Sequence, residues 1–415
     1  MTSNFWENSA GGLFRSLGSR AYRNYFFGQA FSLLGTWMQH AALGWLAFSF
    51  HQQSRWPAWV QAAQLLPSVI IGPIAGMLID QVPKRALILS TQAILIFLAL
   101  VLATAEIMDW LDPTLLILWA VVSGMVMAVD LPARLSYLVD LVGRESLPNA
   151  VALNSFAFNL ARALGPSLAA ALLWRFGVEA CFLLNALSYS AVIFALWGNN
   201  IPGEPHPRPV GGNLVPARIP PNLLGMIALA GVVSCLGWPV LALCPGYAAQ
   251  VLLMGPTAYS LVVGAIGLGA LGACGVVATE KTAGFRGVRM GASMLCVAVG
   301  LLTMGMVNQL FLSVIGALLV GLGMVGFMAT AQTVIQMGAP PELRGRILGT
   351  WTATLSGALP LGNFVAGPLA DAWGVDWVLR AMGLGIFVAW AVWTALSARK
   401  LNNWTNLVQS ANNNS

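Results

Sequence analysis

The stretch Gly76-Met77-Leu78-Ile79-Asp80-Gln81-Val82-Pro83-Lys84-Arg85 is a short charged turn between two long apolar runs. The run before the turn begins near Trp56, and the run after it continues to about Ala105. A helix needs about 20 apolar residues to cross the hydrocarbon core of a membrane. The pattern therefore predicts two membrane-spanning helices joined at one face of the membrane.

The composition extends this prediction to the whole chain. Its 415 residues are 58% hydrophobic and only 8% charged, whereas a soluble domain carries roughly 25% charged residues. So few polar side chains could not cover a water-soluble fold. At about 20 residues a span, the length predicts an all-α integral membrane protein of about twelve transmembrane helices. The five cysteines lie inside apolar runs without a CxxC pair, so we expect no disulfide, metal site or cofactor.

A proline-rich segment divides the chain near its midpoint. Residues 199–221 hold seven prolines and three glycines, a composition typical of a linker. The segment separates an N-terminal six-helix bundle, residues 1–198, from a C-terminal six-helix bundle, residues 222–398, which a polar tail, residues 399–415, follows. The expected spans are about 25–50, 59–79, 86–107, 113–135, 148–174, 180–197, 222–247, 257–279, 288–307, 310–337, 347–373 and 378–398.

The two bundles repeat one another at a nearly constant offset. Two positions recur 200 residues later and two recur 197 residues later. The matched pairs are Gly72 with Gly272, Asp80 with Glu280, Gly165 with Gly362 and Gly177 with Gly374. Such matches on both sides of a linker indicate a parallel six-plus-six repeat.

The basic residues predict the orientation in the membrane. Lys and Arg collect in cytoplasmic loops, so the face that holds most of them is expected to be cytoplasmic. With the N-terminus inside, the far side holds only Arg55, Arg175 and Arg380, and the inner loops hold Arg15, Arg20, Arg23, Lys84, Arg85, Arg144, Arg208, Arg218, Lys281, Arg286, Arg289, Arg344, Arg346, Arg399 and Lys400. Both termini are therefore predicted to be cytoplasmic, and the net charge of +6 does not require a nucleic-acid partner.

Two six-span halves, a central linker and the charged turn resemble the major facilitator superfamily of secondary transporters. The signature of that family in this loop is matched by Gly76, Asp80, Lys84 and Arg85, whereas Gln81 and Pro83 replace its first arginine and its glycine. Three further stretches, Arg23–Leu46, Leu141–Ser155 with Ala161–Pro166, and Pro340–Trp351, resemble the enterobactin-exporter-like branch of efflux proteins. The resemblance implies export of siderophores, drugs or other amphipathic molecules, usually against a proton gradient, across a bacterial cytoplasmic membrane.

The charged turn is predicted to be a conformational latch. The resemblance implies that Asp80 lies against the start of span 11, where a carboxylate gains about 0.3–1 kcal/mol from the helix dipole. Lys84 or Arg85 is expected to pair with Asp140 or Asp130 on span 4. The alternative is a solvated charge cluster that only follows the distribution of basic residues, and Lys84 fits that alternative well.

Two charged positions fall within spans. Arg162 lies in the middle of span 5, on one face with Asn154, and either binds a polar or anionic group of a substrate or anchors neighbouring helices. Asp130, near the inner end of span 4, is one turn from Arg134 and either carries a proton or forms a structural ion pair with Arg134 or Arg85.

Polar side chains on apolar helices must point away from lipid. Those of spans 1, 2, 5 and 10 are therefore expected to line a substrate cavity or to join helices. They are Gln29, Ser32, Thr36, Gln39, Gln61, Gln64, Asn154, Arg162, Gln332 and Gln336. Gly165-Pro166 resembles the antiporter signature, although Ala161, Ala169 and Ala170 stand where that signature has glycine, and predicts close helix packing.

These features predict a secondary exporter that works by alternating access on a small-molecule substrate, with protons as the coupling ion and membrane lipid around a monomer. A uniporter or importer of the same fold is an alternative, because the sequence does not state direction. A membrane enzyme acting on lipid would need a nucleophile or an acid/base set at the membrane surface, and a channel would not need the latch. No phosphate-binding glycine loop or hydrolase grouping supports ATP-driven transport or catalysis.

Overall fold

The computed structural model describes residues 15–79, 81–197, 201, 219–278, 286–340 and 343–412, and these residues form helices and short connections without a strand. The helices of the first half are η2 (Arg15–Gly18), α2 (Arg20–Ser49), α3 (Arg55–Ile79), α4 (Lys84–Ile107), α5 (Pro113–Phe176) and α6 (Val178–Trp197). Those of the second half are α7 (Pro221–Gly237), α8 (Val240–Gly246), the π-helical turn η3 (Tyr247–Val251), α9 (Gly255–Ala278), α10 (Arg286–Met306), α11 (Leu310–Gly338), α12 (Arg344–Trp373) and α13 (Val375–Asn412).

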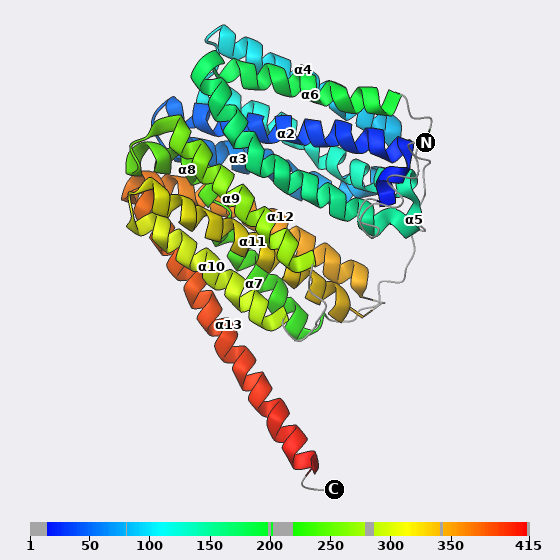
Figure 1. Cartoon of the computed structure of the whole chain (residues 1–415), viewed down its shortest axis with the longest axis vertical. Coiled ribbons are helices and arrows are strands. Elements are labelled where there is room, and N and C mark those ends of the chain that lie inside the picture. Colours follow the sequence, from blue (N-terminus) through cyan, green and yellow to red (C-terminus); the bar gives the residue numbers. More distant parts are fainter. Residues whose placement is uncertain are drawn as a thin grey trace.

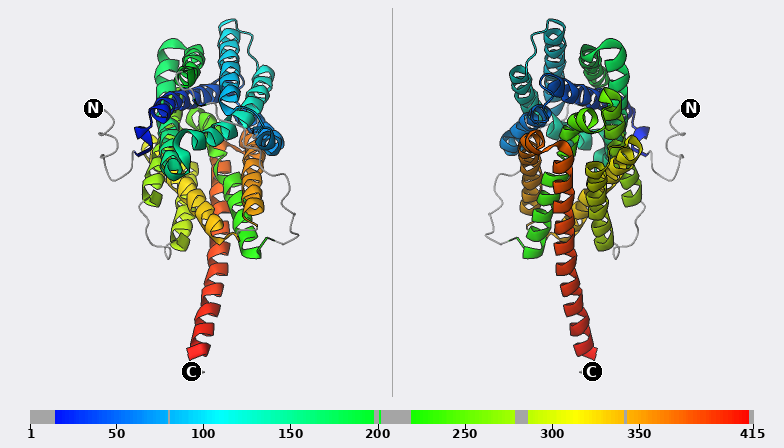
Figure 2. Two further views of the ribbon diagram at one scale, coloured as in Figure 1. Left: turned by 90° about the vertical axis from the view of Figure 1, so that its right-hand side faces the viewer. Right: turned by 90° about the vertical axis from the view of Figure 1, so that its left-hand side faces the viewer.

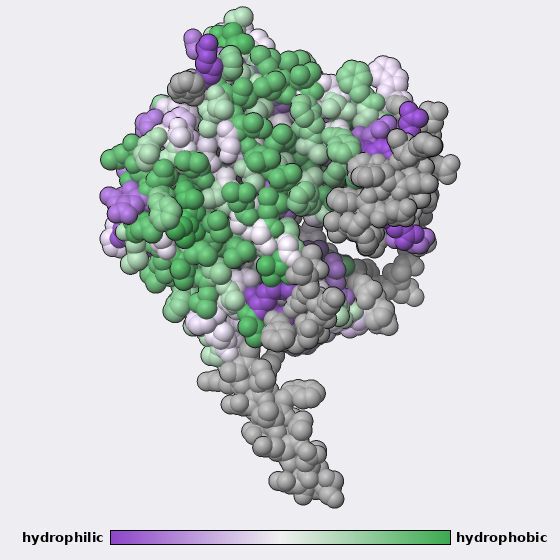
Figure 3. Space-filling model, viewed as in Figure 1, coloured by the Kyte–Doolittle hydropathy of each residue, from purple (hydrophilic) through white to green (hydrophobic). Residues whose placement is uncertain are grey.

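Within the described parts of the chain, nine helical segments are long and apolar enough to cross a membrane. The helices α2, α3 and α12 carry more polar residues or proline but are 30, 25 and 30 residues long, and at 1.5 Å a residue each exceeds the roughly 30 Å hydrocarbon core. Together they make twelve spans, as the sequence predicts. Apolar side chains cover the middle of the face seen in Figure 3, and hydrophilic ones lie toward its margins, as a multi-pass membrane protein requires.

The fourth and fifth spans are joined by a single residue. The expected spans leave residues 136–147 as a link between them, but α5 continues through these residues and is broken only at Gly143, whose φ of 72° and ψ of 167° are not helical. The helix extends because Tyr137, Leu138 and Leu141 are buried and hold its last turns against the bundle. A side chain at position 143 would strain this left-handed backbone.

Two other helix boundaries differ from those expected. The seventh span is not one continuous helix, because Pro239 separates α7 from α8, and η3 follows directly. The last helix, α13, does not end near residue 398 but runs to Asn412, and Figure 2 shows it extending well beyond the other helices. The linker predicted at 199–221 lies almost wholly outside the described residues.

The two halves form separate groups of helices in Figure 1, α2 to α6 above and α7 to α13 below. Their main mutual contacts are α5 with α9 and α3 with α12. In the numbering of the spans these pairs are 5 with 8 and 2 with 11. The sequence repeat matches span 2 with span 8 and span 5 with span 11. Exchanging the matched spans turns the contact of 5 with 8 into the contact of 11 with 2, so the packing of the halves has the two-fold symmetry of the repeat.

The matched glycines occupy equivalent places in the two halves. A Cβ on Gly165 would lie 2.7 Å from Cβ of Trp37 on the first span. One on Gly362 would meet the backbone oxygen of Cys235 on the seventh span and lie 2.8 Å from Cγ of Pro239. Gly177 and Gly374 end α5 and α12 with φ of 84° and 95°, a region that favours glycine. The repeat in the sequence therefore reflects repeated contacts between helices.

The halves meet through polar contacts at one face of the molecule. We call the face where α2 begins the N-terminal face, and the face where α2 ends and α3 begins the far face. At the far face, Nε of Arg55 lies 2.7 Å from Oδ2 of Asp371 on α12, and Nε2 of Gln250 donates to the backbone oxygen of Gln52 at 2.8 Å. From there the helices of the two halves diverge toward the N-terminal face (Figure 1).

Candidate functional site: a cavity between the two halves

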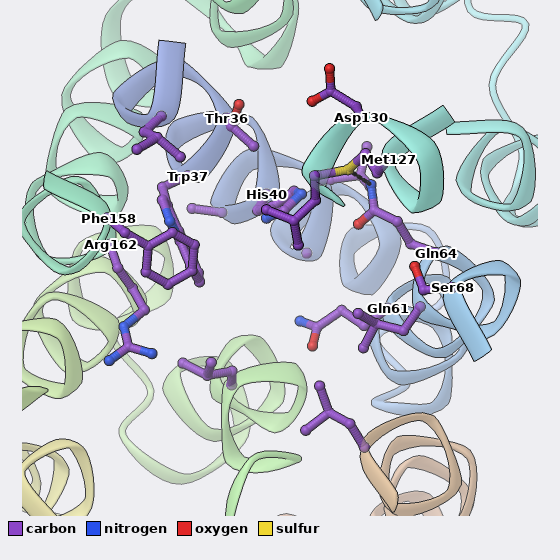
Figure 4. Close-up of a pocket in the computed structure, with 18 of the residues that line it drawn as sticks. Thr36, Trp37, His40, Gln61, Gln64, Ser68, Met127, Asp130, Phe158 and Arg162 are labelled. Atoms are coloured by element: carbon purple, nitrogen blue, oxygen red, sulfur yellow. Dashed lines mark hydrogen bonds between the residues drawn. The ribbon is translucent and has the colours of Figure 1, made fainter. Parts of the chain in front are cut away.

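A cavity of about 470 Å³ lies between the halves. Its lining comes from α2, α3, α5 and α6 of the first half and from α8, α9, α12 and Trp238 of the second. Most of the lining is apolar or aromatic, with a few polar side chains, which is the usual make-up of a site for a small organic molecule. In Figure 4, Trp37, Phe158 and Arg162 lie on one side of the cavity and Gln61, Gln64 and Ser68 on the other.

Many of the polar residues singled out in the sequence meet in this lining. They are Gln29, Thr36, Gln61, Gln64, Asn154 and Arg162, together with Asp130, Arg134 and Pro166. Nε2 of Gln64 donates to Oγ of Ser123 at 3.2 Å, so α3 and α5 are joined there. Gln61 makes no hydrogen bond within the described part of the chain, and its amide points into the cavity in Figure 4.

The polar residues predicted along the first span, Gln29, Ser32, Thr36 and Gln39, lie on two faces of α2. Gln29, Thr36 and His40 face the cavity. Ser32 and Gln39 are buried on the neighbouring face against α6, where Oε1 of Gln39 accepts a hydrogen bond from Nδ2 of Asn185 at 2.9 Å. Positions three residues apart in a helix differ by about 60° in direction, so one stripe can serve a cavity and a helix contact.

Gln332 and Gln336 do not reach the cavity. Both side chains are exposed near the end of α11, and neither is among the lining residues. The second half contributes instead Trp238, Tyr259 and Asn363, which the sequence reasoning missed. The only signal for them was indirect, since Trp238 precedes the proline that breaks the seventh span and Asn363 is an isolated amide in α12.

Arg162 is the least compensated charge in the site. The residue is only 4% exposed to solvent. Its guanidinium carbon lies 5.8 Å from the ring centre of Trp37 and 5.1 Å from that of Trp238. One terminal nitrogen donates to Oδ1 of Asn159 at 2.9 Å, and Nε has no hydrogen-bond partner. No carboxylate among the described residues forms an ion pair with it. Indole faces favour a cation, but they leave most of the five N–H groups of an arginine unused.

Both carboxylate oxygens of Asp130 have partners. Its side chain accepts hydrogen bonds from Oγ1 of Thr91 at 2.5 Å and from Nε2 of Gln92 at 3.0 Å, and it forms an ion pair with Arg134 one turn away. Of the two partners expected for Asp130, the observed one is therefore Arg134. Arg85 instead donates from Nε to the backbone oxygen of Leu196 at 3.1 Å.

The charged turn holds a buried ion pair. Nζ of Lys84 lies 2.8 Å from Oδ2 of Asp140, and the side chain of Lys84 is only 4% exposed. The alternative that Lys84 is a solvated loop charge is therefore wrong, because the long extension of α5 covers it. Gly76 lies in α3, and Asp80 lies outside the described residues, so the contact of Asp80 with span 11 stays a prediction.

Gly165 and Pro166 follow Arg162 on α5 and have different surroundings. Gly165 is buried against the backbone of α2, where Trp37 and Met38 leave no room for a side chain. Pro166 lines the cavity. Close packing of the fifth span on the first thus sets the position of Arg162 relative to Trp37.

Comparison with known proteins agrees with this architecture. The family model described as transmembrane secretion effector matches residues 12–414. The chain is 27% identical over 167 residues to a staphyloferrin A transporter of Staphylococcus aureus, covering 40% of this chain and 42% of that protein. It is 26% identical over 365 residues to the multidrug efflux pump Tap of Mycolicibacterium fortuitum, covering 83% of this chain and 87% of that protein.

A solved structure shares the fold. It is that of a bacterial homolog to the human lysosomal transporter Spinster, in an inward-facing and occupied conformation, with a TM-score of 0.72 and 12% identity. The match covers 92% of this chain and 97% of that one. The chain belongs to the transmembrane secretion effector family of the major facilitator superfamily, and it is a multi-pass integral membrane protein.

Proposed function

We propose that this member of the major facilitator superfamily exports an amphipathic small molecule from the cytoplasm by alternating access, coupled to protons. The observation that carries the proposal is the cavity between the halves, because its walls come from both. If the halves rock about the cavity, access changes from one membrane face to the other while the substrate stays between them.

The orientation in this proposal rests on the basic residues. Arg20 begins α2, Lys84 and Arg85 begin α4, and Arg286 begins α10, all at the N-terminal face. Since cytoplasmic loops collect Lys and Arg, we assign the N-terminal face to the cytoplasm. The polar contacts between Arg55 and Asp371 then close the outer side, and the cavity is accessible from the cytoplasm, where an exporter would collect its substrate.

Outward transport is supported by the multidrug efflux pump among the relatives. A small-molecule substrate is also consistent with the staphyloferrin A transporter, of which the matched region covers 42%. Proton coupling is supported by Asp130, because it is the one acid among the lining residues. Protonation of its carboxylate would release Arg134 from the ion pair, and that change could bias the two conformations differently. In this proposal Gly76 and Asp80 stabilise the closed state of the cytoplasmic side by contact with the second half, and the Lys84–Asp140 pair, which joins α4 to α5 within the first half, holds the start of α4 beside them.

Transport by the full chain in proteoliposomes with an imposed pH gradient tests the proposal. A panel of amphipathic dyes and siderophores would be offered, with protein-free liposomes and a protonophore as controls. We expect accumulation of at least one compound that the protonophore abolishes. Movement of a compound only down its own concentration gradient, without dependence on the pH gradient, would instead indicate a uniporter. No transport of any compound under any gradient would contradict the proposal. Sidedness of the inserted protein, determined by protease access to the C-terminal segment, separates export from import.

A further inference from the structure

The wall of the cavity carries a positive charge that none of the described residues neutralises. Its ionised lining residues are Asp130, Arg134 and Arg162 when histidine is neutral. Asp130 is paired with Arg134, so these two cancel. Arg162 therefore remains as a buried cation without a counter-ion among the described residues.

The surroundings of Arg162 hold its guanidinium in place but leave it able to bind. The rings of Trp37, from the first half, and Trp238, from the second, lie 5.8 and 5.1 Å from its central carbon. Asn159 accepts one N–H bond, and Asn159 is itself fixed by its bond to the backbone oxygen of Ser155 at 2.9 Å. The buried Nε–H has no partner. A planar anion is the group that pairs best with the N–H fork of an arginine.

The opposite part of the cavity offers neutral polar groups. Oδ1 of Asn363 on α12 is buried and has no hydrogen-bond partner, and the amide of Gln61 on α3 has none among the described residues. These groups can bind hydroxyl, amide or carbonyl groups, but neither can neutralise a cation. With Asp130 already paired, the cavity has no free acid for a lipophilic cation.

We infer that the substrate is an organic anion whose carboxylate binds Arg162 while its apolar body lies against Trp37 and Phe158. The inference rests on the proposed transport function and adds the chemical class of the substrate. It also predicts discrimination: an unpaired arginine rejects cations of the same size and shape, because they would meet the uncompensated like charge of a buried guanidinium.

Three probes of nearly one shape test the inference by binding to the purified full-length protein. They are 1-naphthaleneacetate, the neutral 1-naphthaleneacetamide and the cationic 1-naphthylmethylammonium, and calorimetry or quenching of tryptophan fluorescence gives the dissociation constants. We expect the wild type to bind the anion at least about tenfold more tightly than the amide, as one charge-assisted hydrogen bond allows, and the cation more weakly still.

Arg162→Gln should lower the affinity for the anion to that of the amide and leave the affinity for the amide within about a factor of three, since Gln keeps a donor but not the charge. Arg162→Lys should retain part of the preference for the anion, because the charge remains without the planar fork. The matched control is Arg175→Gln, on the same helix but exposed at the far face and outside the lining residues. An unchanged elution volume and melting temperature would show that each variant is folded.

Equal binding of the three probes, no binding of the anion to wild type, or anion binding that survives Arg162→Gln would overturn the inference. Its failure is distinct from failure of the proposed function. A protein that transports the amide or the cation under a pH gradient without preferring the anion is a transporter with another substrate class. A protein that binds the anion through Arg162 but moves nothing across proteoliposomes has the site without the transport.

Discussion

Asp371 of the second half binds the beginning of helix α3 in the first half through Arg55 and the backbone. Its carboxylate accepts hydrogen bonds from the backbone nitrogens of Ser54 at 2.6 Å and Arg55 at 3.3 Å and from Nε of Arg55 at 2.7 Å. A carboxylate at this place satisfies free N–H groups of the helix start and interacts favourably with the helix dipole. The four-residue spacing from Gly367 to Asp371 is also the spacing from Gly76 to Asp80, although the repeat of the two halves matches Asp80 with Glu280.

Asp371→Asn should weaken closure of the far face, because the neutral amide loses the ion pair and a good acceptor for the helix start. We expect a loss near the low end of about 1–3 kcal/mol, since the side chain of Arg55 is 37% exposed. The measurement is the yield of cross-linking, by a short bifunctional thiol reagent, between cysteines introduced as Gln52→Cys and Gln250→Cys. These two positions belong to different halves.

The matched control for this experiment is Asp112→Asn. Asp112 is also at the far face and caps a helix, but its bond to the backbone nitrogen of Leu115 stays within the first half. Its replacement should leave the cross-linking yield unchanged. A yield that is the same with and without Asp371→Asn would contradict the role of Asp371 in closure.

Removing one partner of the Lys84–Asp140 pair should destabilise the protein strongly. The side chains are 4% and 15% exposed, and breaking a buried ion pair by removing one partner costs about 3–5 kcal/mol. Lys84→Met and Asp140→Leu should each lower the melting temperature of the detergent-solubilised chain, and the double variant should recover part of the loss because neither charge remains. The exposed pair Arg15–Glu145 is the control, and Arg15→Gln should change stability by less than about 1 kcal/mol. Equal effects at the two sites would contradict the importance of burial.

Asp130→Asn should uncouple transport from protons, and it leaves Arg134 without its ion pair in the cavity wall. The asparagine oxygen can still accept from Thr91 and Gln92, but the side chain can no longer exchange a proton or pair with Arg134. We expect transport driven by a pH gradient to fall to the level seen without a gradient, with binding of the neutral 1-naphthaleneacetamide nearly unchanged. Asp376→Asn serves as control, since Asp376 forms the same kind of i,i+4 pair with Arg380 away from the cavity. Full gradient-driven transport by Asp130→Asn would exclude Asp130 as the proton carrier.

Gly165→Ala should destabilise the first half by about 1–3 kcal/mol, because the added methyl would lie 2.7 Å from Cβ of Trp37 and the helices must separate. Gly362→Ala should have a similar effect in the second half, against Pro239. Gly357→Ala is the control: a Cβ there meets no atom within 4 Å, and alanine favours the helix by up to about 1 kcal/mol. Thermal unfolding of the three variants gives the measurement. If Gly165→Ala is as stable as Gly357→Ala, the close helix contact at Gly165 does not exclude a methyl group.

The sequence was sufficient to predict the twelve spans and the repeat, because apolar length and glycine spacing are properties of the chain alone. It was not sufficient to decide which neighbour each polar side chain meets. Gln29 and Gln39 are both amides on the inward side of α2, yet one borders the cavity and the other binds Asn185 of α6. The difference depends on how much of the α2 surface is covered by α6, and the spacing of polar residues along α2 carries no information about that.

The second half of the site was harder to predict for a different reason. Trp238 and Asn363 belong to no polar stripe, and they reach the cavity because the seventh span is broken and α12 packs across α3. Gln332 and Gln336 do form a stripe, but it lies on an exposed part of α11. A stripe shows that a helix has a polar side, whereas the tertiary packing decides whether that side borders the cavity.

Membrane voltage acts on the charge that Arg162 leaves in the cavity wall. With an anion bound, the site is neutral, and after release it carries one positive charge. If the chain exports the proposed anion, each cycle moves one net negative charge outward, a direction that an inside-negative potential favours by about 2.3 kcal/mol for every 100 mV. Inward movement of a proton in the same cycle would add a second charge in the favourable sense. The charge of Arg162 returns to its starting place in every cycle, so export is electrogenic because the substrate is an anion, and the resting potential of the cell becomes a source of energy alongside the pH gradient.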